Sequence, residues 1–241
     1  MKWAEIGMDQ YDRHARLKPA LLCLLPGTLT CAVLVPGDIL GWSGAAAATV
    51  HAGGTFLLAQ VVGDVGKRRE PELYRLWGGR PTEISLSHRH AANKISLATR
   101  HAKMATLLPG VSVPSAEDEE SNFQQAMEVY GACTGKLRSI ARDDSKRGSA
   151  VLRENIHYGF RRNLWALKRW GIALSAAALT VLGSVVGANV AGHASVDPVA
   201  VGVLVVDALF LLGWLLFVNP EWVRRAAVLY SERLLELLDS I

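Results

Sequence analysis

The chain has 241 residues, half of them are hydrophobic, and its mean hydropathy is +0.20. One ordinary globular domain is the default for this length, but the apolar share together with the positive mean hydropathy favours a protein embedded in lipid. The formal net charge is +4, and the three cysteines provide no disulfide framework.

Four apolar stretches approach or exceed the roughly 20 residues that a helix needs to cross a bilayer. In chain order they are 20–36, 42–65, 171–190 and 199–218. The first is short and contains Pro26 and Gly27, so we interpret it as a kinked span that pairs with the second. A cleaved signal peptide is the alternative, although Glu5, Asp9 and Asp12 precede the stretch.

Outside the four apolar stretches, segments that contain lysine and arginine alternate with short connections that contain neither. Four precede the first span, nineteen lie between the second and third spans, three follow the fourth, and the two short connections have none. Because positively charged loops stay in the cytosol, the pattern predicts an all-α, four-span protein of the cell inner membrane with both termini cytosolic. The predicted parts are a cytosolic segment 1–19, a hairpin 20–65, a basic helical cytosolic domain 66–170, a second hairpin 171–218 and a cytosolic tail 219–241.

The predicted cytosolic domain contains 19 basic residues, against 11 acidic residues counted from Glu70 to Glu154. We expect a turn-rich connector at 66–80 and helices at 82–108 and 115–142. A third helix should begin near Ser149 and continue into the third span. The surplus of positive charge favours an anionic partner, and anionic lipid headgroups are the competing interpretation.

Basic and aromatic side chains share faces of two of these helices, a composition that binds phosphates and stacks bases. The predicted ligand-binding residues are Arg89, Arg100, Lys103, Tyr158, Arg161, Arg162 and Trp165. Arg161 and Arg162 are the preferred candidates, with a solvated face as the alternative. We assign Lys168, Arg169 and Trp170, which adjoin the third span, to anchoring at the membrane interface.

The sequence contains no recognisable catalytic arrangement. The glycine pairs at 53–54 and 78–79 lack the spacing of a phosphate loop, and His88 and His90 would diverge on a helix. We therefore predict no enzyme activity, no cofactor and no metal site.

Polar residues inside the spans are functional candidates because they are costly in lipid. They are His51, Thr180, Ser184, Asn189 and Asp207. His51 and Asp207 each lie about nine residues from the outer start of a span, hence at a similar depth of roughly 14 Å, where they would pair. That pair would be either a structural hydrogen bond or a polar gate. Thr180, Ser184 and Asn189 would either line a narrow path in an oligomer or permit close helix packing.

The tail is predicted to be an amphipathic helix that begins after Asn219 and Pro220. Its apolar positions alternate by four and three residues: Val223, Ala227, Tyr230, Leu234, Leu237 and Ile241. This seam would form a short coiled coil or dock onto cytosolic helices of the same or a neighbouring subunit. It favours a homo-oligomer, for which we expect a tetramer.

Two local sequences, 76–82 and 154–163, occur within this order of two spans, basic insert, two spans and helical tail. In this arrangement the chain resembles four-span membrane effectors of bacterial anti-phage systems of the Hailong and Kiwa types. The resemblance implies a membrane-disrupting channel that an oligonucleotide holds closed or opens.

The leading functional hypothesis is thus a homo-oligomeric channel or pore-forming effector, gated by a nucleotide or a single-stranded oligonucleotide on its basic domain. Membrane lipid and an operon-encoded protein are further expected partners. The alternative is a non-conducting scaffold or sensor whose basic faces bind lipid or a protein. A small transporter is disfavoured because no inverted repeat is evident.

The charge-free outer loops predict the topology, which cysteine labelling from outside the cell tests in a background without native cysteines. Gly41→Cys and Ser195→Cys should react, whereas Ser145→Cys and Ser240→Cys should not. Labelling at position 145 from outside would contradict the four-span scheme.

Overall fold

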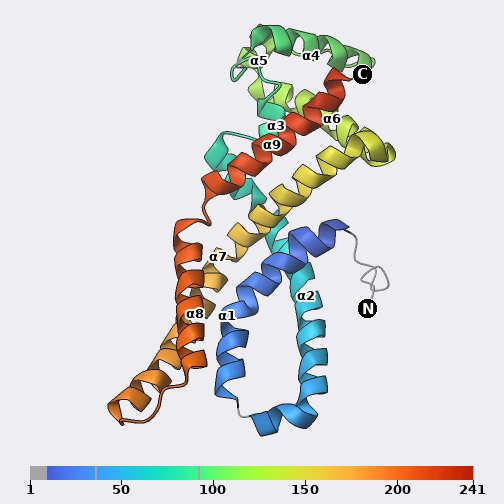
Figure 1. Cartoon of the computed structure of the whole chain (residues 1–241). Coiled ribbons are helices and arrows are strands. Elements are labelled where there is room, and N and C mark those ends of the chain that lie inside the picture. The colour runs from blue at the N-terminus through green and yellow to red at the C-terminus, as the bar shows by residue number, and fades with distance from the viewer. Residues whose placement is uncertain (1–9, 36, 92, 241) are drawn as a thin grey trace. The chain divides into compact units, whose positions relative to one another are not determined.

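The structure, a computed structural model, describes residues 10–35, 37–91 and 93–240 (Figure 1). Its elements are η2 (Asp12–Leu17), α1 (Lys18–Leu34), α2 (Gly37–Trp77), α3 (Pro81–Ile84), α4 (Lys94–Leu107), α5 (Ala116–Ser121), α6 (Phe123–Asp143), α7 (Ser145–Ala191), α8 (Pro198–Leu216) and α9 (Pro220–Asp239). The described residues contain helices and no strand, so the predicted all-α class is confirmed.

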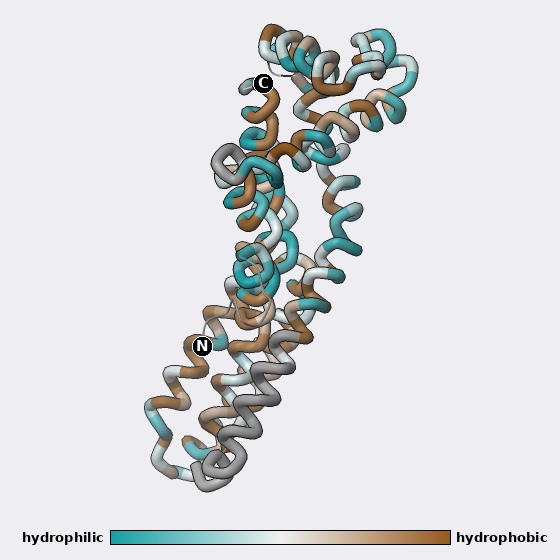
Figure 2. The backbone as a smooth tube through the Cα atoms, turned by 90° about the vertical axis from the view of Figure 1, so that its right-hand side faces the viewer, coloured by the Kyte–Doolittle hydropathy of each residue, from teal (hydrophilic) through white to brown (hydrophobic). Residues whose placement is uncertain are grey.

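The chain forms two compact units. Unit 1 comprises Met1–Arg69 and Gly159–Trp222, and unit 2 comprises Glu70–Tyr158 and Val223–Ile241. Figure 2 shows that hydrophobic residues predominate along the helices of unit 1, whereas hydrophilic and hydrophobic residues alternate in unit 2. Helices α2, α7 and α9 each contribute residues to both units.

Three described helical stretches are long and apolar enough to cross a membrane, namely Asp12–Leu34, Gly148–Ala191 and Pro198–Leu216. They indicate a membrane-embedded protein, and the first, third and fourth predicted spans overlap them. The second predicted span, 42–65, falls on α2. The side chains of residues 37–53, 55 and 56 are outside the described part of the chain, so this span stays a prediction.

A buried polar contact around Asn163 of α7 joins the helices of unit 1. Pro19 has no N–H, so the carbonyl of Ala15, four residues earlier, lacks its usual α-helical donor. The backbone of η2 is π-helical here, and Asn163 Nδ2 donates to the Ala15 carbonyl at 2.7 Å. Gly66 of α2 leaves the necessary space, because a Cβ there would lie 1.9 Å from Asn163 Oδ1.

Unit 2 is a helical bundle around one hydrophobic core. Its largest buried members are Leu86, Met104, Tyr130, Leu137, Leu234, Leu235 and Leu238. The last three belong to α9, and the seam residues Val223 and Ala227 are also buried. The tail helix therefore docks onto helices of its own chain, one of the two outcomes that its apolar seam left open.

The predicted helix at 82–108 is wrong in its first half. The chain forms the short α3, leaves the helix, and re-enters it at α4. Glu119 of α5, which is 2% exposed, explains the interruption: its carboxylate accepts from the Ser87 hydroxyl at 2.5 Å and from the His88 N–H at 2.7 Å. Asn93 then caps α4 by accepting from two backbone N–H groups of its first turn.

Three further expectations have mixed outcomes. The predicted connector at 66–80 is wrong over most of its length, because α2 continues to Trp77 and only then turns through Gly78 and Gly79, both with positive φ. The predicted helix at 115–142 begins where expected, at a capping box formed by Ser115, but it is interrupted at Asn122. The continuous helix from the basic domain into the third span is confirmed as α7.

Glu119 should contribute to stability in a pH-dependent way. Burial raises the pKa of this carboxyl, but hydrogen bonds from Ser87, Tyr130 and the backbone N–H groups of His88 and Arg89 outweigh it, and the net pKa is lowered. A lowered folded-state pKa stabilises the fold above the ordinary value of about 4.5, and this contribution is lost as the pH falls.

We expect Glu119→Gln to lower the free energy of unfolding by about 1–3 kcal/mol at neutral pH, because it removes charge-assisted hydrogen bonds from a buried site. Denaturation of the detergent-solubilised chain, followed by circular dichroism, measures the change. Glu117→Gln, at an exposed position of the same helix, is the matched control. Equal losses in both variants, or a difference that does not shrink below about pH 4.5, would contradict this role for Glu119.

Candidate functional site

Asp207 of α8 is completely buried between helices of unit 1. Its Oδ2 accepts a hydrogen bond from Thr30 Oγ1 of α1 at 2.8 Å. Its Oδ1 has no hydrogen-bond partner among the described residues, and the same holds for the buried Ser175 Oγ of α7. A carboxyl group with one unused oxygen inside an apolar helix bundle can take a further donor or a proton.

The side chain of His51 lies outside the described residues, so its predicted contact with Asp207 stays a prediction. The structure gives Asp207 a different hydrogen-bond partner, Thr30, which the sequence did not indicate. The threonine ties α1 to α8 at a position where lipid would offer the carboxyl group no hydrogen bond.

The predicted pore residues Thr180 and Ser184 are exposed on α7. Thr180 Oγ1 donates to the Ala176 carbonyl at 2.8 Å, and Ser184 Oγ donates to the Thr180 carbonyl at 2.7 Å. Gly187, one turn further, has open space where a Cβ would lie, and Asn189 is half-buried. Because the hydroxyls are satisfied within their own helix, this narrow face can meet either water or another apolar helix at little cost.

The arginines predicted to bind a ligand in unit 1 are engaged inside it. Arg161 Nη1 donates to the Trp222 carbonyl at 3.0 Å, and its guanidinium lies 4.9 Å from the centre of the Trp222 ring. Arg162 is 5% exposed and donates to Asn163 Oδ1 at 3.3 Å.

Trp165 and Tyr158 are buried as well. The guanidinium of Arg69, from α2, lies 4.3 Å from the Trp165 ring centre. In unit 2 the Tyr158 hydroxyl donates to Glu70 Oε1 at 2.6 Å, and its ring stacks on Tyr230. The helix face that was predicted to point outward is therefore buried at several positions, and ligand binding by these residues stays a prediction.

The three remaining predicted ligand-binding residues lie in unit 2 and do not share one helix face, because Arg89 precedes α4. The Arg89 guanidinium lies 4.9 Å from the Phe123 ring centre. Arg100 forms an ion pair of 2.9 Å with Asp239, whose carbonyl oxygen accepts from Lys103 Nζ. These contacts attach the end of α9 to α4.

Unit 2 also contains a pocket of about 410 Å³ that the sequence analysis missed. Its lining residues come from the end of α6, the start of α7 and the middle of α9: Arg138, Ala141, Arg142, Gly148, Ser149, Val151, Leu152, Asn155 and Tyr230. Gly148 permits the tight approach of α7 to α6, since a Cβ there would lie 1.8 Å from the Ala141 carbonyl oxygen. The sequence feature that could have indicated this pocket is the pair Arg138 and Arg142, two arginines one helical turn apart.

No metal site is evident among the residues whose structure is described, because no group of three or more His, Cys, Asp or Glu side chains is suitably arranged. His88 and His101 do meet edge to face, with ring centres 4.6 Å apart, and His101 stacks on Tyr130. Burial lowers the pKa of His101, which favours the neutral ring in this packing.

No protein-family model, no curated protein and no solved structure matches this chain. Its function therefore has to be inferred from the residues and geometry of its two units.

The contact between Thr30 and Asp207 should be visible as an energetic coupling. In a double-mutant cycle of Thr30→Val and Asp207→Leu, we expect a coupling of about 0.6 kcal/mol, the average for hydrogen bonds within membrane proteins. Unfolding of the detergent-solubilised protein gives the four free energies. Thr180→Val, which removes a hydroxyl that bonds only within α7 among the described contacts, serves as the uncoupled control with Asp207→Leu. Additive effects of Thr30→Val and Asp207→Leu would mean that the two side chains do not interact.

Proposed function

We propose that the protein is a homo-oligomeric membrane channel or pore-forming effector, gated by an anionic ligand that binds unit 2. The observation that carries this proposal is the continuity of α7, a single helix of 47 residues. Its first turns line the pocket of unit 2, and its later residues form an apolar stretch suited to a membrane span. A ligand that holds the start of α7 thus acts on the same helix whose later residues are suited to the membrane.

The pocket of unit 2 has the chemistry for a nucleotide or a short oligonucleotide. Arg138 and Arg142 are exposed at its rim, and no ion pair joins either of them to a carboxylate within the described part of the chain. Arginine is suited to phosphate because its planar guanidinium donates in pairs. Tyr230 and Asn155 add an aromatic ring and an amide, and a volume of about 410 Å³ is within the usual range of small-molecule sites.

The exposed face of α7 supports assembly into an oligomer. Thr180, Ser184 and Gly187 are small, lie one turn apart, and are covered by no other described part of the chain. Such a face allows a second helix to approach closely, and in a ring of four chains it would also offer hydroxyl groups to a central path. The proposal includes four spans, an inner-membrane location, cytosolic termini, a role in anti-phage defence and an operon-encoded protein partner.

A second candidate is a non-conducting scaffold or sensor whose basic faces contact lipid. It is favoured by exposed residues of unit 1 of the kind that anchor helices at membrane interfaces. These are Lys67 and Arg68 on α2, and Arg169 and Trp170 on α7, the last being 65% exposed. Conductance measurements on the protein reconstituted in planar bilayers distinguish the two candidates, because only the channel produces a ligand-dependent current.

The ligand pocket predicts a charge-dependent affinity. For a short fluorescein-labelled oligoadenylate, measured by anisotropy with the detergent-solubilised chain, Arg138→Gln with Arg142→Gln should weaken binding. It should also reduce the slope of log K against log salt by about 1.4, since each phosphate contact to a single strand contributes about 0.7.

The matched control is Lys136→Gln, which removes a charge from an exposed position of α6 outside the pocket. It should leave the affinity and the salt slope close to those of the parent. If the parent binds no oligoadenylate at low salt, or if both variants behave alike, the gating ligand does not bind in this pocket and the scaffold becomes the better proposal.

A further inference from the structure

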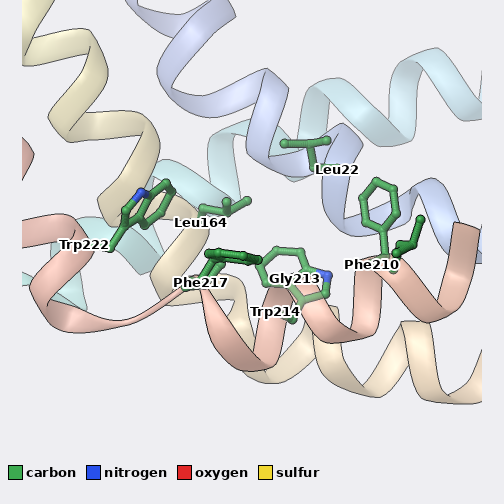
Figure 3. A pocket seen from close by; sticks show the side chains of 9 residues that line it. Leu22, Leu164, Phe210, Gly213, Trp214, Phe217 and Trp222 are labelled. Atoms are coloured by element: carbon green, nitrogen blue, oxygen red, sulfur yellow. The ribbon is translucent and has the colours of Figure 1, made fainter.

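In addition to the pocket in unit 2, the structure has a pocket of about 320 Å³ in unit 1, whose lining is entirely apolar (Figure 3). Its lining includes Leu22 of α1, Leu164 of α7, Phe210 and Trp214 of α8, Phe217 directly after α8, and Trp222 at the start of α9. Gly171 of α7 lets the Trp214 ring pack against the helix, since a Cβ there would lie 2.2 Å from ring atom Cε2.

This pocket opens beside exposed apolar side chains of α8 and of the residue that follows it. The lining residue Phe217 is 69% exposed and Leu209 is 61% exposed, although both are large and hydrophobic. On a helix that is suited to a membrane span, such side chains face lipid, and an apolar hollow among them is filled by hydrocarbon at lower free energy than by water.

Two positively charged side chains contact residues that lie at or beside the pocket. Lys168 Nζ donates to the Val218 carbonyl at 2.8 Å and to the Leu215 carbonyl at 3.4 Å, so an ammonium group lies at the end of α8. The guanidinium of Arg161 lies over Trp222. Lysine has three N–H donors, and these two contacts use two of them.

A glycerophospholipid has two parts that suit this site. Its acyl chain suits the apolar pocket, and its phosphate oxygens can accept from the third N–H donor of Lys168. Trp214, which is 3% exposed, contributes its ring to the wall.

We propose that this pocket binds one acyl chain of an anionic glycerophospholipid, whose phosphate group is held by Lys168 with additional attraction from Arg161. The lipid fills the space between the ends of α1, α7 and α8 and the start of α9. The site is independent of the ligand pocket in unit 2, so either proposal can fail without the other.

Native mass spectrometry of the delipidated full chain in neutral detergent tests the site. Phosphatidylglycerol and phosphatidylcholine with the same acyl chains are added in parallel. We expect one tightly retained phosphatidylglycerol per chain and markedly weaker retention of phosphatidylcholine. Inorganic phosphate in excess should not displace the lipid, because it offers nothing to the apolar pocket.

Lys168→Gln should weaken phosphatidylglycerol retention about tenfold, the usual effect of losing one charge-assisted hydrogen bond. Leu22→Trp, which places a larger side chain in the wall of the apolar pocket, should weaken both lipids. Arg169→Gln removes a neighbouring exposed charge that does not flank the pocket, and it should change neither.

Equal retention of the two lipids by the parent would overturn the proposal, and this comparison needs no variant to fold. Equal effects of Lys168→Gln and Arg169→Gln would overturn it as well, since the lipid would then be held by diffuse charge. Displacement by inorganic phosphate would show that the cations bind a free anion instead.

Discussion

The architecture of unit 1 depends on how the chain accommodates Pro19. A proline within a helix leaves one carbonyl without its usual donor, and where that carbonyl is buried among helices no water is at hand to replace it. Here that carbonyl belongs to Ala15, and the amide of Asn163 reaches it from almost 150 residues further along the chain. Gly66 has to be small for the amide to fit, so one backbone defect determines where three helices meet.

The same region explains why the net charge of the chain is a poor guide to its surface. Arg69, Arg161 and Arg162 stack on tryptophan rings or donate to neighbouring carbonyl and amide oxygens within unit 1. Arginine is suited to this role because its weakly hydrated, planar head covers an aromatic ring and still donates hydrogen bonds. Part of the basic surplus thus serves helix packing near the ends of the apolar stretches, and the exposed arginines of α6 are left as the better candidates for contact with an external anion.

Features that depend on local sequence were predictable, and those that depend on distant partners were not. Hydropathy was sufficient to predict the apolar helices, and the absence of a strong breaker was sufficient to predict the continuity of α7. The seam of α9 predicted an amphipathic helix but left open whether it would form a coiled coil or dock, and onto which subunit. The break before α4 was not predictable, because it follows from Glu119, which lies some thirty residues downstream of the backbone N–H groups that it binds. For the candidate site, the sequence indicated which basic, aromatic and polar residues to consider. It did not indicate the burial of Trp165 or the hydrogen bond between Thr30 and Asp207, because both arise only when separate helices meet.

The docking of α9 has a consequence for how the protein is made. The core of unit 2 takes Leu234, Leu235, Leu237 and Leu238 from the last helix, whereas its other buried members lie before Tyr158. At a translation rate of about 5–20 residues per second, the roughly 80 residues between Tyr158 and Leu238 take about 4–16 s to synthesise. During that interval Leu86, Met104 and Leu137 have no complete core, because the α9 side chains that complete it have not yet been made. A chain released before α9 would carry this apolar surface permanently, and chaperones and proteases would recognise it.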